Sequence, residues 1–149
     1  MPKVNGWDKL LSQITDHLRW VIYKPLADEP DPLSLPFVGE AKTFFTPKNK
    51  VTNPADFAQT LTKNIGPFRT GVIIPGRQFD WRGHRRGRGG GWYDRFLASI
   101  PSSWLRLGLT KPSAITKELI PKPWDQSVDW LIWFDGEWWA HETNARPER

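Results

Sequence analysis

One segment of the chain, residues 70–97, restricts the possible folds more than any other. It begins with a short apolar run at 70–75 that is rich in β-branched residues and bounded by glycine and proline. Such a run is typical of a strand buried on both faces in a parallel sheet. A loop rich in glycine and arginine follows, and residues 92–100 then have the pattern of a helix that ends before Pro101. The segment therefore predicts a strand, a loop and a helix in direct succession, which favours an α/β fold.

The loop also concentrates the positive charge of the protein. The formal net charge is +5, and residues 69–95, with seven arginines and two aspartates, account for all of it. The same window holds seven of the 12 glycines. Because arginines gather where the backbone has most freedom, we expect the loop to bind an anionic ligand.

Composition excludes several other classes of protein. The 149 residues are 38% hydrophobic and 25% charged, with a mean hydropathy of -0.56, as expected for one globular domain. The absence of cysteine excludes a disulfide scaffold, a thiolate metal site and a cysteine nucleophile. No apolar run approaches the roughly 20 residues of a membrane-spanning helix, and the first ten residues lack a signal-peptide core. We therefore expect a cytoplasmic protein.

Further helices and strands are expected on both sides of the loop. Apolar residues at three- and four-residue steps predict a helix over 7–22, with Trp20 on one of its faces. Asn53 and Pro54 are typical of the N-cap and first residue of a second helix that ends near 64–66. The remaining elements are expected at 25–36 (a proline-rich loop), 42–46, 104–109 and 128–134 (strands), and 135–140 (a hairpin turn and its returning strand).

This order of elements predicts the fold class. Helices and strands alternate along the chain, so we expect an α/β fold. The expected architecture is a single three-layer domain over residues 1–149. It has a mixed, mostly parallel sheet flanked by helices, and a C-terminal β-hairpin.

The glycines of the loop have the properties of a phosphate-binding backbone. Consecutive glycines let successive N–H groups point into one concavity, so at least one of Gly89, Gly90 and Gly91 should have a positive φ. The helix that follows adds its unsatisfied N–H groups and the positive end of its dipole. The spacing matches neither a Walker motif nor a dinucleotide-binding fingerprint.

The charged side chains of the loop fit the same ligand. Arg85, Arg86 and Arg88 supply forked donors that match phosphate oxygens. Asp94, in the first turn of the expected helix, could hold Mg²⁺ on the phosphates through a hard oxygen ligand.

From position 75 onward the sequence resembles the signature of the 5-formyltetrahydrofolate cyclo-ligase family, also called methenyltetrahydrofolate synthetases. That signature reads roughly P-G-x-x-F-D-x-x-G-x-R-L-G-x-G-x-G-[YF]-Y-D-R. Arg86 stands in place of the usual leucine and Trp92 in place of the first aromatic residue. The resemblance covers residues 70–134 and includes a downstream proline and two aspartates. The matching positions are Pro75, Gly76, Phe79, Asp80, Gly83, Arg85, Gly87, Gly89, Gly91, Tyr93, Asp94, Arg95, Pro121, Asp125 and Asp129.

The resemblance implies an enzyme that uses ATP and Mg²⁺ to convert 5-formyltetrahydrofolate to 5,10-methenyltetrahydrofolate. In such enzymes the formyl oxygen attacks the γ-phosphate, and N10 of the reduced folate then closes the ring. The resemblance implies catalytic roles for Arg85, Arg88 and Asp94, with Asp94 as the Mg²⁺ ligand. The nucleotide-binding residues that it implies are Gly83, Arg85, Gly87, Arg88, Gly89, Gly90, Gly91, Trp92, Tyr93 and Asp94.

Family members also bring a basic residue from their N-terminal helix to the phosphates. This chain is shorter before the signature strand, so Lys9 is the candidate for that role and Arg86 is a local substitute. Three further roles stay open. His84 is a loop residue or a base, Asp80 caps a turn or binds metal, and Trp92 stacks on a ring or anchors its helix.

A second class of function also fits the loop. Runs of arginine and glycine are typical of segments that bind single-stranded RNA. A non-catalytic nucleic-acid-binding module therefore stays the alternative. The ordered strand and helix that frame the loop favour the nucleotide site.

Overall fold

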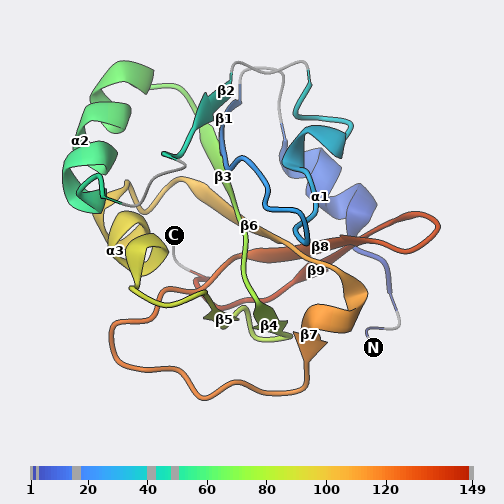
Figure 1. The fold of residues 1–149 in the computed structure, drawn as a ribbon. Helices are drawn as coiled ribbons and strands as arrows, with labels where there is room; N and C mark the ends of the chain where they lie inside the picture. The colour runs from blue at the N-terminus through green and yellow to red at the C-terminus, as the bar shows by residue number, and fades with distance from the viewer. Residues whose placement is uncertain (1, 3, 15–17, 40–42, 48–50, 148–149) are drawn as a thin grey trace.

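The computed structural model describes residues 2, 4–14, 18–39, 43–47 and 51–147. It shows an α/β domain around one large sheet (Figure 1). The strands of this sheet are β1 (Arg19–Ile22), β2 (Thr43–Phe45), β3 (Thr70–Ile74), β6 (Leu105–Leu109), β8 (Trp130–Phe134) and β9 (Trp138–Glu142). Their order across the sheet is β2-β1-β3-β6-β8-β9. All neighbours are parallel except β8 and β9, which form the expected C-terminal hairpin.

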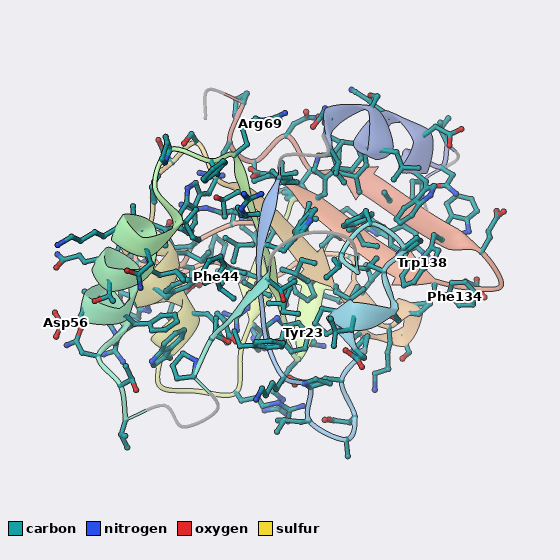
Figure 2. The ribbon with its side chains drawn as sticks, turned by 90° about the horizontal axis from the view of Figure 1, so that it is seen from above. Tyr23, Phe44, Asp56, Arg69, Phe134 and Trp138 are labelled. Atoms are coloured by element: carbon teal, nitrogen blue, oxygen red, sulfur yellow. The ribbon has the colours of Figure 1, made fainter. Side chains whose placement is uncertain are left out.

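Helices cover both faces of this sheet. They are α1 (Trp7–Gln13), α2 (Pro54–Ile65) and α3 (Trp92–Ser99). α2 and α3 pack together on one face, where Ala58 and Phe96 are buried with Val72. α1 lies on the other face against β9, and its Leu10 is buried with Leu107. Figure 2 shows α2 and α1 at opposite ends of the view with the strands between them. The expected three-layer α/β fold is confirmed.

The second helix and the central strand form where local sequence predicts them. The side chain of Asn53 accepts hydrogen bonds from the N–H groups of Ala55 and Asp56, and the helix ends at Ile65 before Gly66. All five residues of β3 are buried, and the strand lies between β1 and β6. Within the described part of the chain, no helix is long and apolar enough to cross a membrane.

The helix expected over 7–22 is wrong beyond Gln13. Residues 19–22 form β1, parallel to both β2 and β3, and residues 15–17 lie outside the described residues. Trp20 is therefore on a strand, directly opposite Gly71, where an added Cβ would come within 2.4 Å of the indole. Because residues 18–22 are almost continuously apolar, a helical period there cannot be distinguished from a buried strand.

The glycine- and arginine-rich segment forms a small sheet with residues 115–116, which the sequence did not predict. β4 (Gln78–Asp80) pairs antiparallel with β5 (Arg85–Arg86) and parallel with β7 (Ile115–Thr116). The buried carboxylate of Asp80 fastens its turn by accepting hydrogen bonds from the N–H groups of Arg82, His84 and Leu119. These bonds favour the turn-capping role for Asp80. They also fix the turn that leads into β5, which carries Arg85.

Candidate functional site

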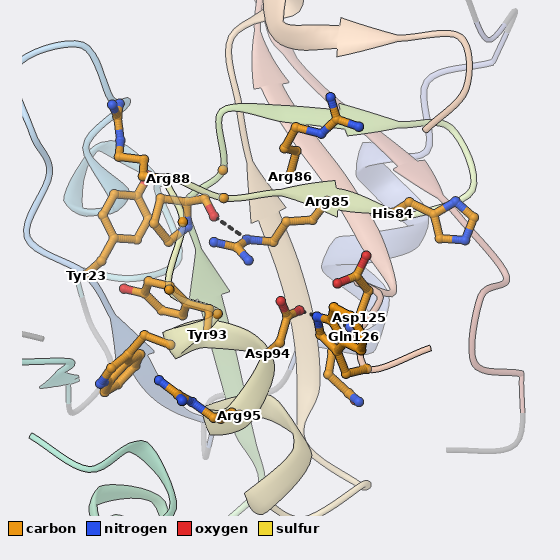
Figure 3. Close-up of a pocket in the computed structure, with 18 of the residues that line it drawn as sticks. Tyr23, His84, Arg85, Arg86, Arg88, Tyr93, Asp94, Arg95, Asp125 and Gln126 are labelled. Carbon is orange, nitrogen blue, oxygen red and sulfur yellow. Dashed lines mark hydrogen bonds between the residues drawn. The ribbon is translucent and has the colours of Figure 1, made fainter. Parts of the chain in front are cut away.

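A cavity of about 940 Å³ opens where β1 and β3 end (Figure 3). In open α/β sheets, ligands bind beyond the carboxyl ends of the strands. The segment after β1, the glycine loop with the start of α3, and residues 119–126 line this cavity. Short pieces that follow β2 (Thr46 and Pro47) and β3 (Pro75 and Gly76) complete the lining. The structure thus brings together every residue of the predicted nucleotide site except Gly83.

Gly83 has a structural place instead. It lies in the turn between β4 and β5 with a φ of 86°, and an added Cβ would stand 2.4 Å from the carbonyl oxygen of Val128. Its own carbonyl oxygen accepts a hydrogen bond from the N–H of Val128. Gly83 therefore joins the small sheet to the start of β8 and does not line the cavity.

The glycine loop has the backbone geometry that anion binding needs. Gly89, Gly90 and Gly91 have φ values of 100°, 78° and 65°, so the predicted positive φ is confirmed at all three. An added Cβ at any of them would meet no atom within 4 Å. Among the residues that the structure describes, none accepts a hydrogen bond from their N–H groups. This backbone thus faces the cavity with free donors at the start of α3.

Arg85 is held in place at the floor of the cavity. Its Nε donates a 2.7 Å hydrogen bond to the carbonyl oxygen of Pro75, and its guanidinium lies 5.1 Å from the centre of the Tyr93 ring. At Gly87 an added Cβ would come within 2.9 Å of Nη2, so glycine leaves room for the guanidinium. Burial lowers the pKa of Arg85, but an arginine in a protein stays charged at neutral pH. A fixed cation therefore faces the cavity.

Asp94 lies opposite this cation, and Figure 3 shows the two side chains pointing toward each other. Its Oδ1 accepts a 3.0 Å hydrogen bond from the backbone N–H of Gln126. Its Oδ2 has no hydrogen-bond partner among the described residues. One carboxylate oxygen is fixed, and the other is available to a ligand.

Arg88, by contrast, is paired with acidic residues from the segment after β1. Its Nη2 lies 2.8 Å from both carboxylate oxygens of Asp28, and its Nε lies 3.5 Å from Glu29. The hydrogen bond from Arg88 lowers the pKa of Asp28. Figure 3 shows the guanidinium of Arg88 pointing away from Asp94. The predicted catalytic residues thus share one cavity, but Arg88 does not face the other two.

Two aromatic residues at the start of α3 shape the wall of the cavity. The Trp92 side chain is 5% exposed, and its indole N–H donates to the carbonyl oxygen of Thr52. These contacts favour its role as an anchor of the helix. The hydroxyl of Tyr93 is 3.0 Å from that of Thr46, and burial raises the pKa of Tyr93 to about 12. Tyr93 is therefore neutral at physiological pH.

Neither Lys9 nor Arg86, the two candidates for an additional basic residue at the phosphates, points to the side of the cavity where Arg85 lies. Lys9 on α1 pairs with Glu142 on β9 and is not part of the cavity lining. Arg86 is exposed at the rim, and Figure 3 shows it pointing away from the side to which Arg85 points. This is the expected alternation of neighbouring residues on a strand. His84 also lines the cavity, with its Nδ1 at 2.9 Å from the Asp80 carboxylate.

Sequence reasoning missed two walls of the cavity. Tyr23, Lys24 and Glu29 line it because they follow β1, the segment that was expected to be helical. Had residues 18–22 been interpreted as a strand, its carboxyl end would have indicated these positions. Trp124 and Gln126 come from the long segment before β8, where only the pattern of aspartates gave a signal.

The residues of this cavity fit a magnesium-bound nucleotide. Mg²⁺ commonly takes one or two carboxylates and completes its coordination with water and substrate phosphates. Asp94 supplies one free carboxylate oxygen, and the described residues contain no cluster of three potential metal ligands that would form a closed protein site. The free N–H groups of the loop and the fixed Arg85 suit the phosphates.

Fold and site together define an α/β protein with a glycine-rich anion-binding loop at the carboxyl edge of a parallel sheet. The family model of the 5-formyltetrahydrofolate cyclo-ligase family matches residues 10–133. The chain belongs to this family. Membership indicates 5-formyltetrahydrofolate cyclo-ligase activity, and hence an enzyme.

Solved structures show the same fold. One neighbour is a 5,10-methenyltetrahydrofolate synthetase from Mycoplasma pneumoniae, with a TM-score of 0.56 and 17% identity over 83% of this chain and 79% of that chain. Another is the 5,10-methenyltetrahydrofolate synthetase of Aquifex aeolicus, with a TM-score of 0.61 and 20% identity over 97% of this chain and 80% of that chain. A search of curated protein sequences finds no match.

Proposed function

We propose that this protein uses ATP and Mg²⁺ to convert 5-formyltetrahydrofolate to 5,10-methenyltetrahydrofolate in the cavity beside the glycine loop. One observation carries the proposal: a fixed cation at Arg85, a free carboxylate oxygen at Asp94 and the unpaired N–H groups of the loop border the same cavity. Phosphoryl transfer depends mainly on positioning and charge neutralisation, and these groups supply both.

The reaction divides into two balanced steps. The formyl oxygen attacks the γ-phosphorus of ATP while the bond to the bridging oxygen breaks and ADP leaves. N10 then attacks the activated carbon and gives up its proton to solvent, and the C–O bond breaks to release inorganic phosphate. The loop N–H groups and Arg85 bind the phosphates, and Asp94 would hold Mg²⁺, which neutralises charge on them when bound.

The cavity is large enough for two substrates. Its volume of about 940 Å³ lies near the upper end of the range of ligand pockets. The loop, which we assign to the phosphates, occupies one side of the cavity. The exposed apolar side chains of Leu26, Ile120 and Trp124 line the remaining walls. We assign the reduced folate to these walls. We also propose that residues 1–149 act as one domain in the cytoplasm.

The proposal is tested by nucleotide binding and turnover in the same preparation. Mg-ATP should raise the melting temperature in a saturable manner, because a ligand at 100 times its Kd adds about 2.7 kcal/mol. Asp94→Asn should keep the fold and weaken Mg-ATP binding more than tenfold. Asp56→Asn is the matched control, because Asp56 is also an aspartate in the first turn of a helix.

Two results would reject the proposal. One is an unchanged affinity for Mg-ATP in Asp94→Asn. The other is binding to RNA that weakens steeply with salt, without a saturable effect of Mg-ATP, which would favour the nucleic-acid-binding alternative.

A further inference from the structure

Arg106 is a buried arginine that the loop chemistry does not use. It lies in β6 and is 4% exposed. Burial, together with the nearby charge of Arg146, lowers the pKa of Arg106 to about 10, so the guanidinium is positive at neutral pH. Burying an arginine is costly unless its charge and its donors have partners. Its partners therefore show what the residue does.

Those partners join three parts of the fold. Nη2 donates a 2.9 Å hydrogen bond to the carbonyl oxygen of Leu97 in α3, and Nη1 donates one of 3.1 Å to Oε1 of Gln126. The backbone N–H of Arg106 donates to Asp129, which also pairs with Arg146 at 2.8 Å. Arg106 thus ties Gln126 to both the sheet and α3.

Gln126 is in turn the residue that holds Asp94. Its backbone N–H donates the 3.0 Å hydrogen bond to Oδ1 of Asp94, as Figure 3 shows. The contact joins residues 32 positions apart, so the place of Gln126 depends on tertiary contacts. Outer partners of this kind orient the groups that bind a metal.

We propose that Arg106 and Gln126 are positioning residues for the magnesium ligand Asp94. Arg106 fixes Gln126, and the N–H of Gln126 fixes one oxygen of Asp94, which leaves the other oxygen aimed for the ion. The inference rests on the proposed function, because it concerns the same Asp94.

The test is the affinity for Mg²⁺ in the presence of a saturating, non-hydrolysable ATP analogue, measured by calorimetry. Gln126→Leu and Arg106→Met should each weaken Mg²⁺ binding about tenfold, the lower end of the effect of losing an outer partner. Gln126→Glu should keep the affinity for Mg²⁺ within about threefold of that of the parent protein, because the new carboxylate still accepts a hydrogen bond from Arg106. Binding of the analogue without metal should not change.

A matched control separates positioning from general loss of stability. Ile132→Val removes a methylene from the core cluster that contains Leu10, on the other face of the sheet, and should leave Mg²⁺ affinity unchanged. If Arg106→Met does not fold, the partly buried Gln126→Leu carries the test.

The outcomes separate this inference from the proposed function. Unchanged Mg²⁺ affinity in Gln126→Leu, or an equal loss in Ile132→Val, overturns the positioning role alone. A parent protein that binds the analogue with no dependence on Mg²⁺ overturns both.

Discussion

The guanidinium of Arg88 contacts both carboxylate oxygens of Asp28 at 2.8 Å, although 60 residues separate them in sequence. This pair joins the glycine loop to the segment after β1, and Arg88 itself lines the cavity. Arg88 also lies 3.5 Å from Glu29. A phosphate bound at the loop therefore competes with two carboxylates for one arginine.

The first prediction follows from this competition. Asp28→Asn should raise the affinity for ATP two- to fivefold, because an ion pair exposed to solvent competes only weakly for Arg88. Asp135→Asn at the exposed β8–β9 turn makes the same change of net charge and should have no effect. Equal nucleotide affinity in Asp28→Asn and the parent, measured by calorimetry, would show that Arg88 does not serve the phosphates.

The second prediction concerns the loop backbone. Gly90 has a φ of 78°, and a side chain there has open space but a strained backbone. Gly90→Ala should cost about 1 kcal/mol of unfolding free energy and reduce ATP affinity more than tenfold. Gly39→Ala, where an added Cβ also meets nothing and φ is ordinary, is the control. Full ATP affinity in Gly90→Ala would contradict the role of this backbone.

The third prediction tests the corrected assignment of β1. Gly71 lies opposite Trp20, and an added Cβ would come within 2.4 Å of the indole. Gly71→Ala should therefore lower the unfolding free energy by about 1–3 kcal/mol in urea denaturation. The double variant with Trp20→Phe should recover part of that loss. Additive losses in the double variant would mean that the two residues do not touch.

The fourth prediction concerns pH. Burial acts to raise the pKa of Asp80, but hydrogen bonds from Leu119 and His84 outweigh it, so the pKa lies below its ordinary value. A carboxylate with a lowered pKa stabilises the fold above its unfolded pKa of about 3.9, and this stabilisation is lost as the pH falls further. Unfolding free energy should therefore decline below about pH 4.

The matching variant shows whether Asp80 causes this decline. Asp80→Asn should lower the unfolding free energy by about 1–3 kcal/mol at pH 7, because buried N–H groups lose an acceptor. It should also reduce the decline of the unfolding free energy below about pH 4. Asp135→Asn serves again as the control for net charge. If the unfolding free energy of Asp80→Asn falls with pH as steeply as that of the parent, other groups cause the decline.

Much of the loop was predictable because its signals are local. The glycines at 89–91, the helix start at Trp92 and Asp94 in the first turn all follow from neighbouring residues in sequence. The capping of α2 by Asn53 is predictable for the same reason.

What could not be predicted depends on contacts between distant residues. The strand β1 has the same apolar run as a buried helix, and only its place between β2 and β3 decides between them. The partner of Arg88 is 60 residues away, and Lys9 pairs with Glu142 at the far end of the chain. Sequence spacing contains no signal for such pairs.

The central claim is that the formyl oxygen of the folate attacks the γ-phosphate of ATP in this cavity. It is tested most directly with 5-formyltetrahydrofolate that carries ¹⁸O in the formyl group, with Mg-ATP and the purified protein. We expect methenyltetrahydrofolate and ADP in equal amounts and the ¹⁸O in the released inorganic phosphate. Unlabelled phosphate, or no methenyltetrahydrofolate at all, would contradict the account.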